Sequence, residues 1–156
     1  VARYDAVVDR SPHGPLLDDS LMAAAALLRK SGKSAEAAVR LERLVKTFRS
    51  SIIIGHYNLL KLGEGTLLLG EVYLKDLRDP VRAITTLEVL LKRQPTSILC
   101  DDALFLMAEA ALQKHAPPSP EDRAEACRHL DRLLKAHPDG NQVRRATKLR
   151  TELSCS

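Results

Sequence analysis

One pattern occurs twice in this chain, as PLLDDSL at residues 15–21 and as ILCDDAL at residues 98–104, 83 positions later (98 minus 15). The paired acids and flanking leucines coincide, and a small residue follows the last leucine by four positions in both copies, at Ala25 and Ala108. Leucine and alanine dominate the chain, and both are strong helix formers. Recurrence within such a composition predicts a repetitive, all-helical architecture.

A second pattern marks the ends of the repeating units. In it, a basic amphipathic stretch is followed by a segment that ends a helix. Three of these segments begin with proline, at Pro12, Pro95 and Pro138, and Arg49-Ser50-Ser51 fills the same slot without it. Proline cannot continue a helix, and the small or polar residues after it ease the turn. The segments begin at positions 12, 49, 95 and 138, which gives spacings of 37, 46 and 43 residues. Such spacings are typical of single-hairpin helical repeats.

The middle unit contains LGEVY at residues 69–73, followed by Ala83, Leu87, Leu90 and Pro95. This pattern resembles the tetratricopeptide repeat, which has L-G-x2-Y on its first helix and A-x3-F with a closing proline on its second. Leucine replaces the usual phenylalanine at position 87, and the tryptophan slot holds Leu21, Thr66 and Leu104. The matching residues of the other units are Ala25, Leu28, Ala37, Leu41 and Leu44, and Ala108, Ala111, Ala126, Leu130, Leu133 and Pro138.

The resemblance covers nearly the whole chain and implies an all-α fold, an α-solenoid of antiparallel helix hairpins forming a right-handed superhelical array. We expect one tetratricopeptide-like domain over residues 1–156. Its expected parts are the second helix of a truncated preceding repeat at 1–14, repeats at 15–51, 52–97 (with a long link) and 98–140, and a capping helix at 141–153. Because residues 1–14 match only a second helix, we expect the chain to be part of a longer protein.

Helix starts are marked by residues that cap or open a helix. Ser34, Asp79 and Ser119 precede helical patterns and are favourable N-cap residues. Pro80 and Pro120 directly follow two of them, at a position where the missing N–H costs nothing. These residues predict that a second helix begins near each of the three sites.

The chain has three cysteines, a small and odd number that does not suit a disulfide framework. We expect Cys100 and Cys127 to be buried as small apolar residues, and Cys155 to be a loose thiol near the end. A bridge between Cys100 and Cys127 is the alternative, and it requires export to an oxidising compartment.

Residues suited to catalysis or metal binding do not form a recognisable motif. Cys127 and His129 are two positions apart, so on a helix their side chains point in different directions. His115 and His137 lie near predicted helix ends, where a cation stabilises the helix dipole. The acidic pairs at 18–19 and 101–102 recur at the start of a first helix, which favours a dipole role over calcium. The sequence predicts no enzymatic activity, no metal and no cofactor.

The overall composition of the chain limits the classes of binding partner that we expect. Hydrophobic residues make up 45% of the 156 residues and charged residues 28%, with a net charge of +4. Aromatic residues contribute only 3% and tryptophan is absent, whereas nucleic-acid binders combine basic residues with stacking aromatics. Apolar runs fall short of the roughly 20 residues that span a bilayer. We expect no nucleic-acid ligand, and only indirect membrane association.

In tetratricopeptide arrays the first helices line a concave groove that holds a peptide or a partner helix, so the resemblance implies that this chain binds another protein. When the groove positions of the family are transferred to this chain by the register of the repeats, they hold both carboxylates and apolar residues. The expected partner-binding residues are Asp19, Met22, Arg29 and Lys30, then Glu64, Leu67, Glu71, Leu74 and Lys75, and then Asp102, Phe105, Glu109, Leu112 and Gln113. The alternative for each is a solvated face or an inter-repeat contact.

The second helices are more basic, through Arg40, Arg43, Lys46, Lys92, Arg93, Arg128, Arg132 and Lys135. A solvated face is the usual meaning of such charges. The alternative functions are a basic surface that binds anionic lipid or nucleic acid, and a docking segment of a larger enzyme. The irregular units also resemble the divergent repeats of bacterial cell-envelope proteins. That resemblance implies a role in envelope assembly and a periplasmic or envelope location, with the cytoplasm as the alternative.

Overall fold

The structure is a computed structural model that describes residues 1–10, 16–50 and 56–155, with all their side chains except those of 47–50 and 56–60. All regular secondary structure in the described part is helical, and no strand is present there. In chain order its elements are α1 (Ala2–Arg10), α2 (Leu17–Lys30), α3 (Ser34–Ser50), α4 (His56–Glu71), the π-helical turn η1 (Val72–Asp76), α5 (Pro80–Arg93), α6 (Cys100–Leu112), α7 (Pro120–Ala136) and α8 (Val143–Glu152). The expected stop segments at 11–15 and the link at 51–55 lie outside the described residues.

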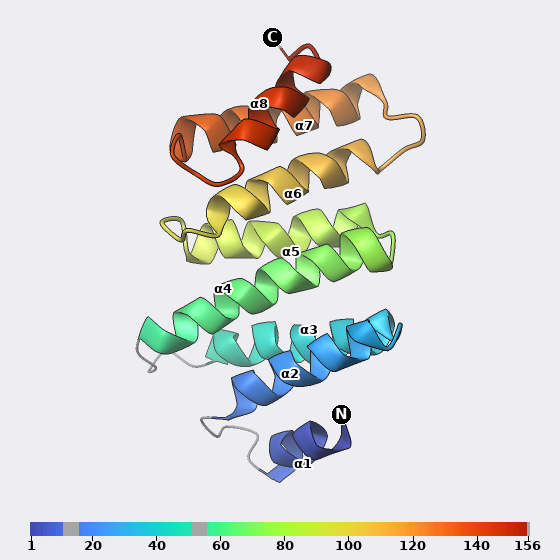
Figure 1. Cartoon of the computed structure of the whole chain (residues 1–156), viewed down its shortest axis with the longest axis vertical. Helices are drawn as coiled ribbons and strands as arrows, with labels where there is room; N and C mark the ends of the chain where they lie inside the picture. Colours follow the sequence, from blue (N-terminus) through green and yellow to red (C-terminus); the bar gives the residue numbers. More distant parts are fainter. Residues whose placement is uncertain (11–15, 51–55, 156) are drawn as a thin grey trace.

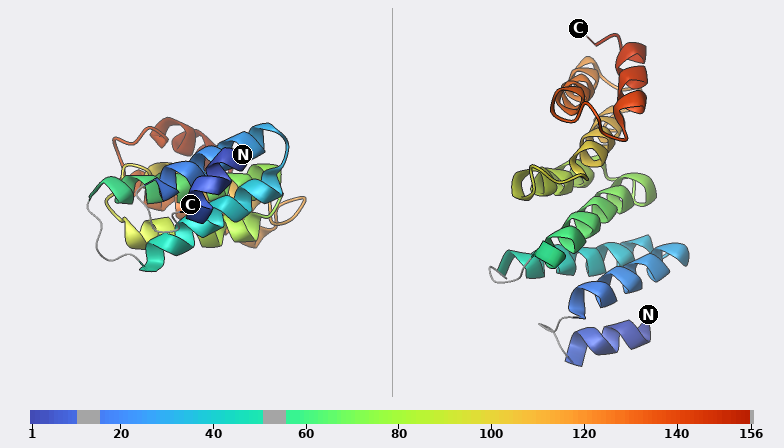
Figure 2. Two further views of the ribbon diagram at one scale, coloured as in Figure 1. Left: turned by 90° about the horizontal axis from the view of Figure 1, so that it is seen from below. Right: turned by 60° about the vertical axis from the view of Figure 1, so that its left-hand side comes forward.

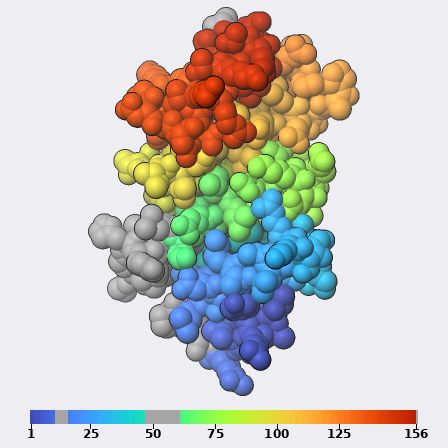
Figure 3. All heavy atoms as spheres, viewed as in Figure 1, coloured from blue at the N-terminus to red at the C-terminus, as the bar shows by residue number. Residues whose placement is uncertain are grey.

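The helices stack one upon another along the long axis of the molecule, with the two termini at opposite ends (Figure 1). Pairs α2–α3, α4–α5 and α6–α7 form hairpins, and each packs on the next pair, as the side view also shows (Figure 2). The space-filling view shows the segments as successive bands from one end to the other (Figure 3). The predicted all-α array of helix hairpins is confirmed.

A core of leucine and alanine runs through the stack from α2 to α8. The small residues that mark the repeat, Ala25 and Ala108, are buried, and so are the leucines of the second helices, among them Leu41, Leu87 and Leu130. A smaller cluster of Val8, Leu17, Leu21 and Leu44 holds α1 on the first hairpin. Because each hairpin buries its apolar stripe only against its neighbours, the core is continuous across the repeats.

The predicted caps are confirmed at two of the three second helices. The Asp79 carboxylate accepts a hydrogen bond from the backbone N–H of Arg82 at 2.9 Å, in front of Pro80. Ser119 and Asp122 form a reciprocal capping box at the start of α7, with distances of 3.1 and 2.9 Å. Ser34 differs, because it is the first residue of α3 and its hydroxyl donates to Asp76 at 3.1 Å.

Helices α4 and α5 approach each other closely at Gly70. A Cβ atom placed at Gly70 would lie 2.7 Å from Cδ2 and 2.8 Å from Cγ of Leu87, which is itself buried. Overpacking of this kind costs about 1–3 kcal/mol. The glycine of the L-G-x2-Y pattern is therefore required here by close packing.

The end of the first helix in the middle unit departs from a regular α-helix. In η1 the N–H of Leu77 donates to the carbonyl oxygen of Val72 at 3.0 Å, a spacing of five residues. The chain then turns through Arg78, whose φ is 56°, into the cap of α5. This wider turn places the side chain of Asp76 toward the preceding hairpin, where Arg29 donates to it at 2.7 Å.

The expectation for the cysteines was wrong for two of the three. Cys127 of α7 and Cys155 are joined in a disulfide, with their Cα atoms 5.6 Å apart. Cys100 is a free, buried thiol, as predicted, and it donates to the carbonyl oxygen of Gln94. The pairing arises because α8 folds back on α7, which brings together residues that are 28 positions apart. A bridge between Cys100 and Cys127 is not formed.

No helix among the described residues combines the length and the apolar character needed to cross a bilayer.

Candidate partner-binding groove

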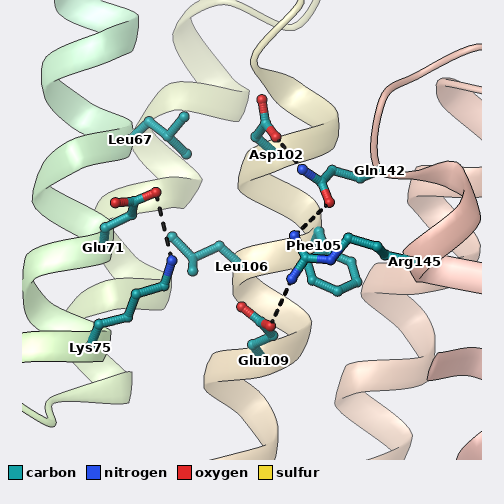
Figure 4. A pocket seen from close by; sticks show the side chains of 9 residues that line it. All are labelled: Leu67, Glu71, Lys75, Asp102, Phe105, Leu106, Glu109, Gln142 and Arg145. Atoms are coloured by element: carbon teal, nitrogen blue, oxygen red, sulfur yellow. Dashed lines mark hydrogen bonds and ion pairs between the residues drawn. The ribbon is translucent and has the colours of Figure 1, made fainter.

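An open pocket lies where α4, η1, α6 and α8 meet (Figure 4). Its lining consists of Leu67, Glu71, Lys75, Asp102, Phe105, Leu106, Glu109, Gln142 and Arg145. Positions 67, 71 and 75 are spaced by four, and positions 102, 105, 106 and 109 by three and four, so each set lies on one face of its helix. The helical register therefore brings two first helices to one pocket.

Polar contacts connect α6 to α8 on one side of this pocket. The Gln142 amide donates to Asp102 at 2.6 Å and accepts from Arg145 at 3.0 Å. Arg145 also pairs with Glu109 at 3.4 Å, and its guanidinium lies 4.2 Å from the centre of the Phe105 ring. A guanidinium placed over an aromatic ring is attracted by the charge distribution of the ring. Arg145 is thus oriented by three neighbours while 59% of its side chain stays exposed.

Paired acidic and basic side chains lie on the opposite side of the pocket, beside Leu67. Glu71 lies 3.8 Å from Lys75 and 3.2 Å from Arg29, and Arg29 also holds Asp76. The hydrogen bond from Arg29 lowers the pKa of Asp76 below its ordinary value, against the opposing effect of burial. Asp76 therefore stays charged at neutral pH, and Arg29 and Lys75 balance its charge and that of Glu71 on this side of the pocket.

The predicted groove residues separate into those that line the pocket and those that do not. Leu67, Glu71, Lys75, Asp102, Phe105 and Glu109 all line it. Phe105 is nevertheless 6% exposed, because Arg145 covers it. Leu74 is fully buried, so its expected contact with a partner is wrong: it faces the core. Partner contact by the remaining residues stays a prediction.

The other predicted groove residues extend the charged row toward α2. Asp19 pairs with Lys61 at 3.3 Å, and Lys61 lies 3.9 Å from Glu64. Met22 is half-buried between α2 and α4, with its sulfur near Gly65. Gln113 is exposed at the C-terminal end of α6, beyond the residues that line the pocket.

Sequence reasoning missed three residues of the pocket: Leu106, Gln142 and Arg145. Leu106 lies four positions after Asp102, so its register could have shown it. Gln142 and Arg145 belong to the start of α8, which was expected to be an end cap. Their place at the pocket depends on how α8 folds against α6 and α7, and local sequence does not contain that information.

The candidate catalytic residues have structural roles. His115 bonds the Asp122 carboxylate at 2.8 Å, and that carboxylate already belongs to the capping box of α7. The sulfur of Cys127 is held in the disulfide, so it forms no pair with His129. Burial lowers the pKa of His129 below its ordinary value. The described residues contain no cluster of three or more histidine, cysteine or acidic side chains placed to hold a metal.

The basic residues of the second helices are mostly exposed, as expected of a solvated face. Arg43, Lys46, Lys92, Arg93, Arg128, Arg132 and Lys135 are exposed on α3, α5 and α7. Arg40 is the exception: it is half-buried and pairs with Asp5 of α1 at 2.9 Å. These basic residues thus lie on other helices than the residues that line the groove.

The stack of hairpins and the groove along its first helices define a helical-repeat protein. A comparison with protein families matched the tetratricopeptide repeat at residues 66–97 and 102–140, the units that contribute η1 and α6 to the groove. These two units, which make up slightly less than half of the chain, are tetratricopeptide repeats. A search of curated protein sequences found no match. Tetratricopeptide repeats are in general protein–protein interaction modules and are typically non-catalytic.

Proposed function

We propose that this protein is a scaffold that holds a segment of a partner protein in the groove between α4, α6 and α8. The observation that carries the proposal is the pocket itself, where side chains from two consecutive first helices and from α8 converge. The residues are held in place by one another before any partner arrives, and such preorganisation reduces the entropy lost on binding.

The charge of the groove supports a basic partner segment. The lining of the pocket holds three carboxylates (Glu71, Asp102, Glu109) and two cations (Lys75, Arg145), a balance of −1. The whole chain carries +4, so the groove is negative within a positive molecule. Complementary charge steers association and selects partners. The partner we propose has an apolar side chain for Leu67, flanked by lysine or arginine.

Labelled ten-residue peptides test this proposal, with a central pair of leucines flanked by lysines, by glutamates or by serines. The lysine peptide is expected to bind tightest in fluorescence anisotropy. Glu71→Lys and Glu109→Lys are each expected to weaken it at least fivefold, because they remove an attraction and add a repulsion. Glu88→Lys on α5 is the matched control and is expected to bind normally. Circular dichroism checks that each variant is folded.

Two outcomes would count against the groove. If the glutamate peptide binds as tightly as the lysine peptide, the charge argument is wrong. If the glutamate peptide binds tightest and loses affinity steeply with salt, the basic faces of α3, α5 and α7 are the binding surface instead.

We further propose that the scaffold acts in the bacterial cell envelope, in the periplasm. Two observations support this: the resemblance of its irregular repeats to envelope proteins, and the disulfide between Cys127 and Cys155. Disulfides form and persist in oxidising compartments and are rare in the cytosol. Rapid alkylation of the protein in intact cells tests the proposal, and recovery of both cysteines as free thiols would contradict it.

A further inference from the structure

We propose that α8 is a wall of the partner-binding groove, that Arg145 is a specificity-determining residue on this wall, and that the Cys127–Cys155 disulfide holds the wall in place. The inference rests on the proposed groove and adds to it a requirement for the oxidised protein. Three observations lead to it: the weak packing of α8, the two ends at which it is fastened, and the position of Arg145.

Helix α8 packs on the stack mainly through apolar residues that are only partly buried, Val143 and Leu149, followed by Leu153. Ala146 is its one buried residue, and Arg144, Arg145, Lys148 and Arg150 give it a strongly basic character. The helix beneath it, α7, is also basic on its exposed face. Terminal segments that bury few apolar residues open locally at low free energy. Polar contacts and the disulfide add to this shallow packing and fix where α8 lies at the groove.

Those contacts lie at the two ends of α8. At the start, the backbone N–H of Gln142 donates to the Asp101 carboxylate at 3.2 Å, and Asp101 is only 3% exposed. At the other end, Arg150 donates to Asp131 at 2.6 Å and the disulfide joins Cys155 to α7. The disulfide is the single covalent attachment between α8 and the rest of the described stack, apart from the chain itself. Breaking it leaves the C-terminal half of α8 attached by the ion pair between Arg150 and Asp131 and by the partly buried side chains of Leu149 and Leu153.

Arg145 is the residue through which a movement of α8 would change the groove. Its guanidinium covers the Phe105 ring and pairs with Glu109, so a displacement of α8 would uncover an apolar ring and free a carboxylate. Arg145 lines the pocket, where its guanidinium donates to Gln142 and Glu109 (Figure 4). A planar guanidinium recognises carbonyl and carboxylate oxygens. Arg145 therefore selects a partner segment that presents such an oxygen beside its basic side chain.

The disulfide is accessible to a reductant. Cys127 and Cys155 both border an open hollow on the α7 side, together with Arg123, Arg128 and Ser154. Dithiothreitol can therefore reduce it: the dithiol transfers two electrons and two protons, the S–S bond breaks to give two thiols, and the dithiol closes into its own cyclic disulfide. The oxidised and reduced proteins can be compared without any substitution.

The experiment measures hydrogen–deuterium exchange and lysine-peptide affinity in the oxidised and reduced protein. Reduction is expected to raise the amide exchange rate of residues 143–155 at least tenfold, while the exchange rates in α4 and α5 stay the same. It is also expected to lower the affinity for the lysine peptide at least fivefold. Arg145→Ala is expected to weaken binding of the lysine peptide to the oxidised protein. In this variant, reduction of the disulfide is expected to change the peptide affinity very little. Cys100→Ala is the control for the other thiol and is expected to respond to reduction like the unchanged protein.

The two measurements separate the ways in which the inference can fail. Faster exchange in α8 with unchanged peptide affinity would show that α8 is no wall, while the groove itself stands. Unchanged exchange on reduction, confirmed with Cys155→Ser, would overturn the role of the disulfide. A peptide that binds neither form would overturn the proposed function, and the exchange result would still report how α8 is attached.

Discussion

Thr66 shows how a single side chain can be poorly matched to its place in this fold. It occupies the tryptophan slot of the middle unit and is completely buried in α4. Its hydroxyl has no hydrogen-bond partner among the described residues. Burial of a polar group without a partner costs about 1–3 kcal/mol, because the group loses its hydrogen bonds to water.

Thr66→Val is therefore expected to stabilise the protein by about 1 kcal/mol, since valine keeps the shape and removes the hydroxyl. Urea unfolding followed by circular dichroism measures the change. Thr85→Val is the control: the Thr85 hydroxyl is exposed and already donates to the carbonyl oxygen of Val81 at 2.9 Å, so no gain is expected there. A loss of stability in Thr66→Val would contradict the prediction and indicate a bound water at the hydroxyl.

At the scale of elements, the first two hairpins are joined by polar contacts on either side of η1. Arg29 of α2 and Ser34 of α3 both donate to Asp76, while the Tyr73 hydroxyl donates to Glu42 of α3. Burial, followed by the contact with Glu42, raises the pKa of Tyr73 to about 12. The π-helical turn directs both side chains of η1 toward the preceding hairpin, so it fixes how the two repeats stack.

Asp76→Asn is expected to destabilise the protein by about 1–2 kcal/mol at pH 7, because it removes a charge-assisted hydrogen bond between two hairpins. The pKa of Asp76 is lowered in the folded protein, so the folded state binds fewer protons than the unfolded state. Its stabilising contribution is present above the ordinary carboxyl pKa of about 4 and is lost as the pH falls through the lower folded value.

Urea unfolding between pH 7 and pH 2 therefore measures a difference between the two proteins that shrinks below about pH 4. Asp9→Asn on α1 is the control, because Asp9 is exposed, and it is expected to change stability little at any of these pH values. A difference that stays constant down to pH 2 would contradict the role given to the carboxylate.

At the scale of the whole molecule, the helices of the array differ in how deeply they are buried. Helix α6 lies inside the stack and buries ten of its thirteen residues. Helix α1 lies at one end and buries only Val8 among its nine. In a linear array each repeat is stabilised only by its neighbours, so stability varies along the stack.

Amide hydrogen exchange in the native, oxidised protein is therefore expected to be slowest in α6 and fastest in α1. Protection in α1 is expected to depend on its ion pair between Asp5 and Arg40, so Arg40→Ala should speed exchange in α1 and leave α6 unchanged. Equal protection of α1 and α6 would mean that the array unfolds as one cooperative unit.

The sequence by itself determined the class of the fold, because the features that specify it are local. Helical periodicity, the caps at Asp79 and Ser119 and the close-packing glycine at position 70 act within one hairpin. The same register also predicted most of the pocket on α4 and α6, since residues three and four apart share a helix face. These parts of the groove could be found without knowing how the hairpins stack.

Tertiary structure decided the rest, because those features join residues that are far apart in the chain. The π-helical turn aims Asp76 at Arg29 of the preceding hairpin, and neither residue alone indicates the other. The return of α8 pairs Cys127 with Cys155 and places Arg145 over Phe105. Such contacts depend on how the helices pack against each other, and that packing is a property of the whole stack rather than of any one segment.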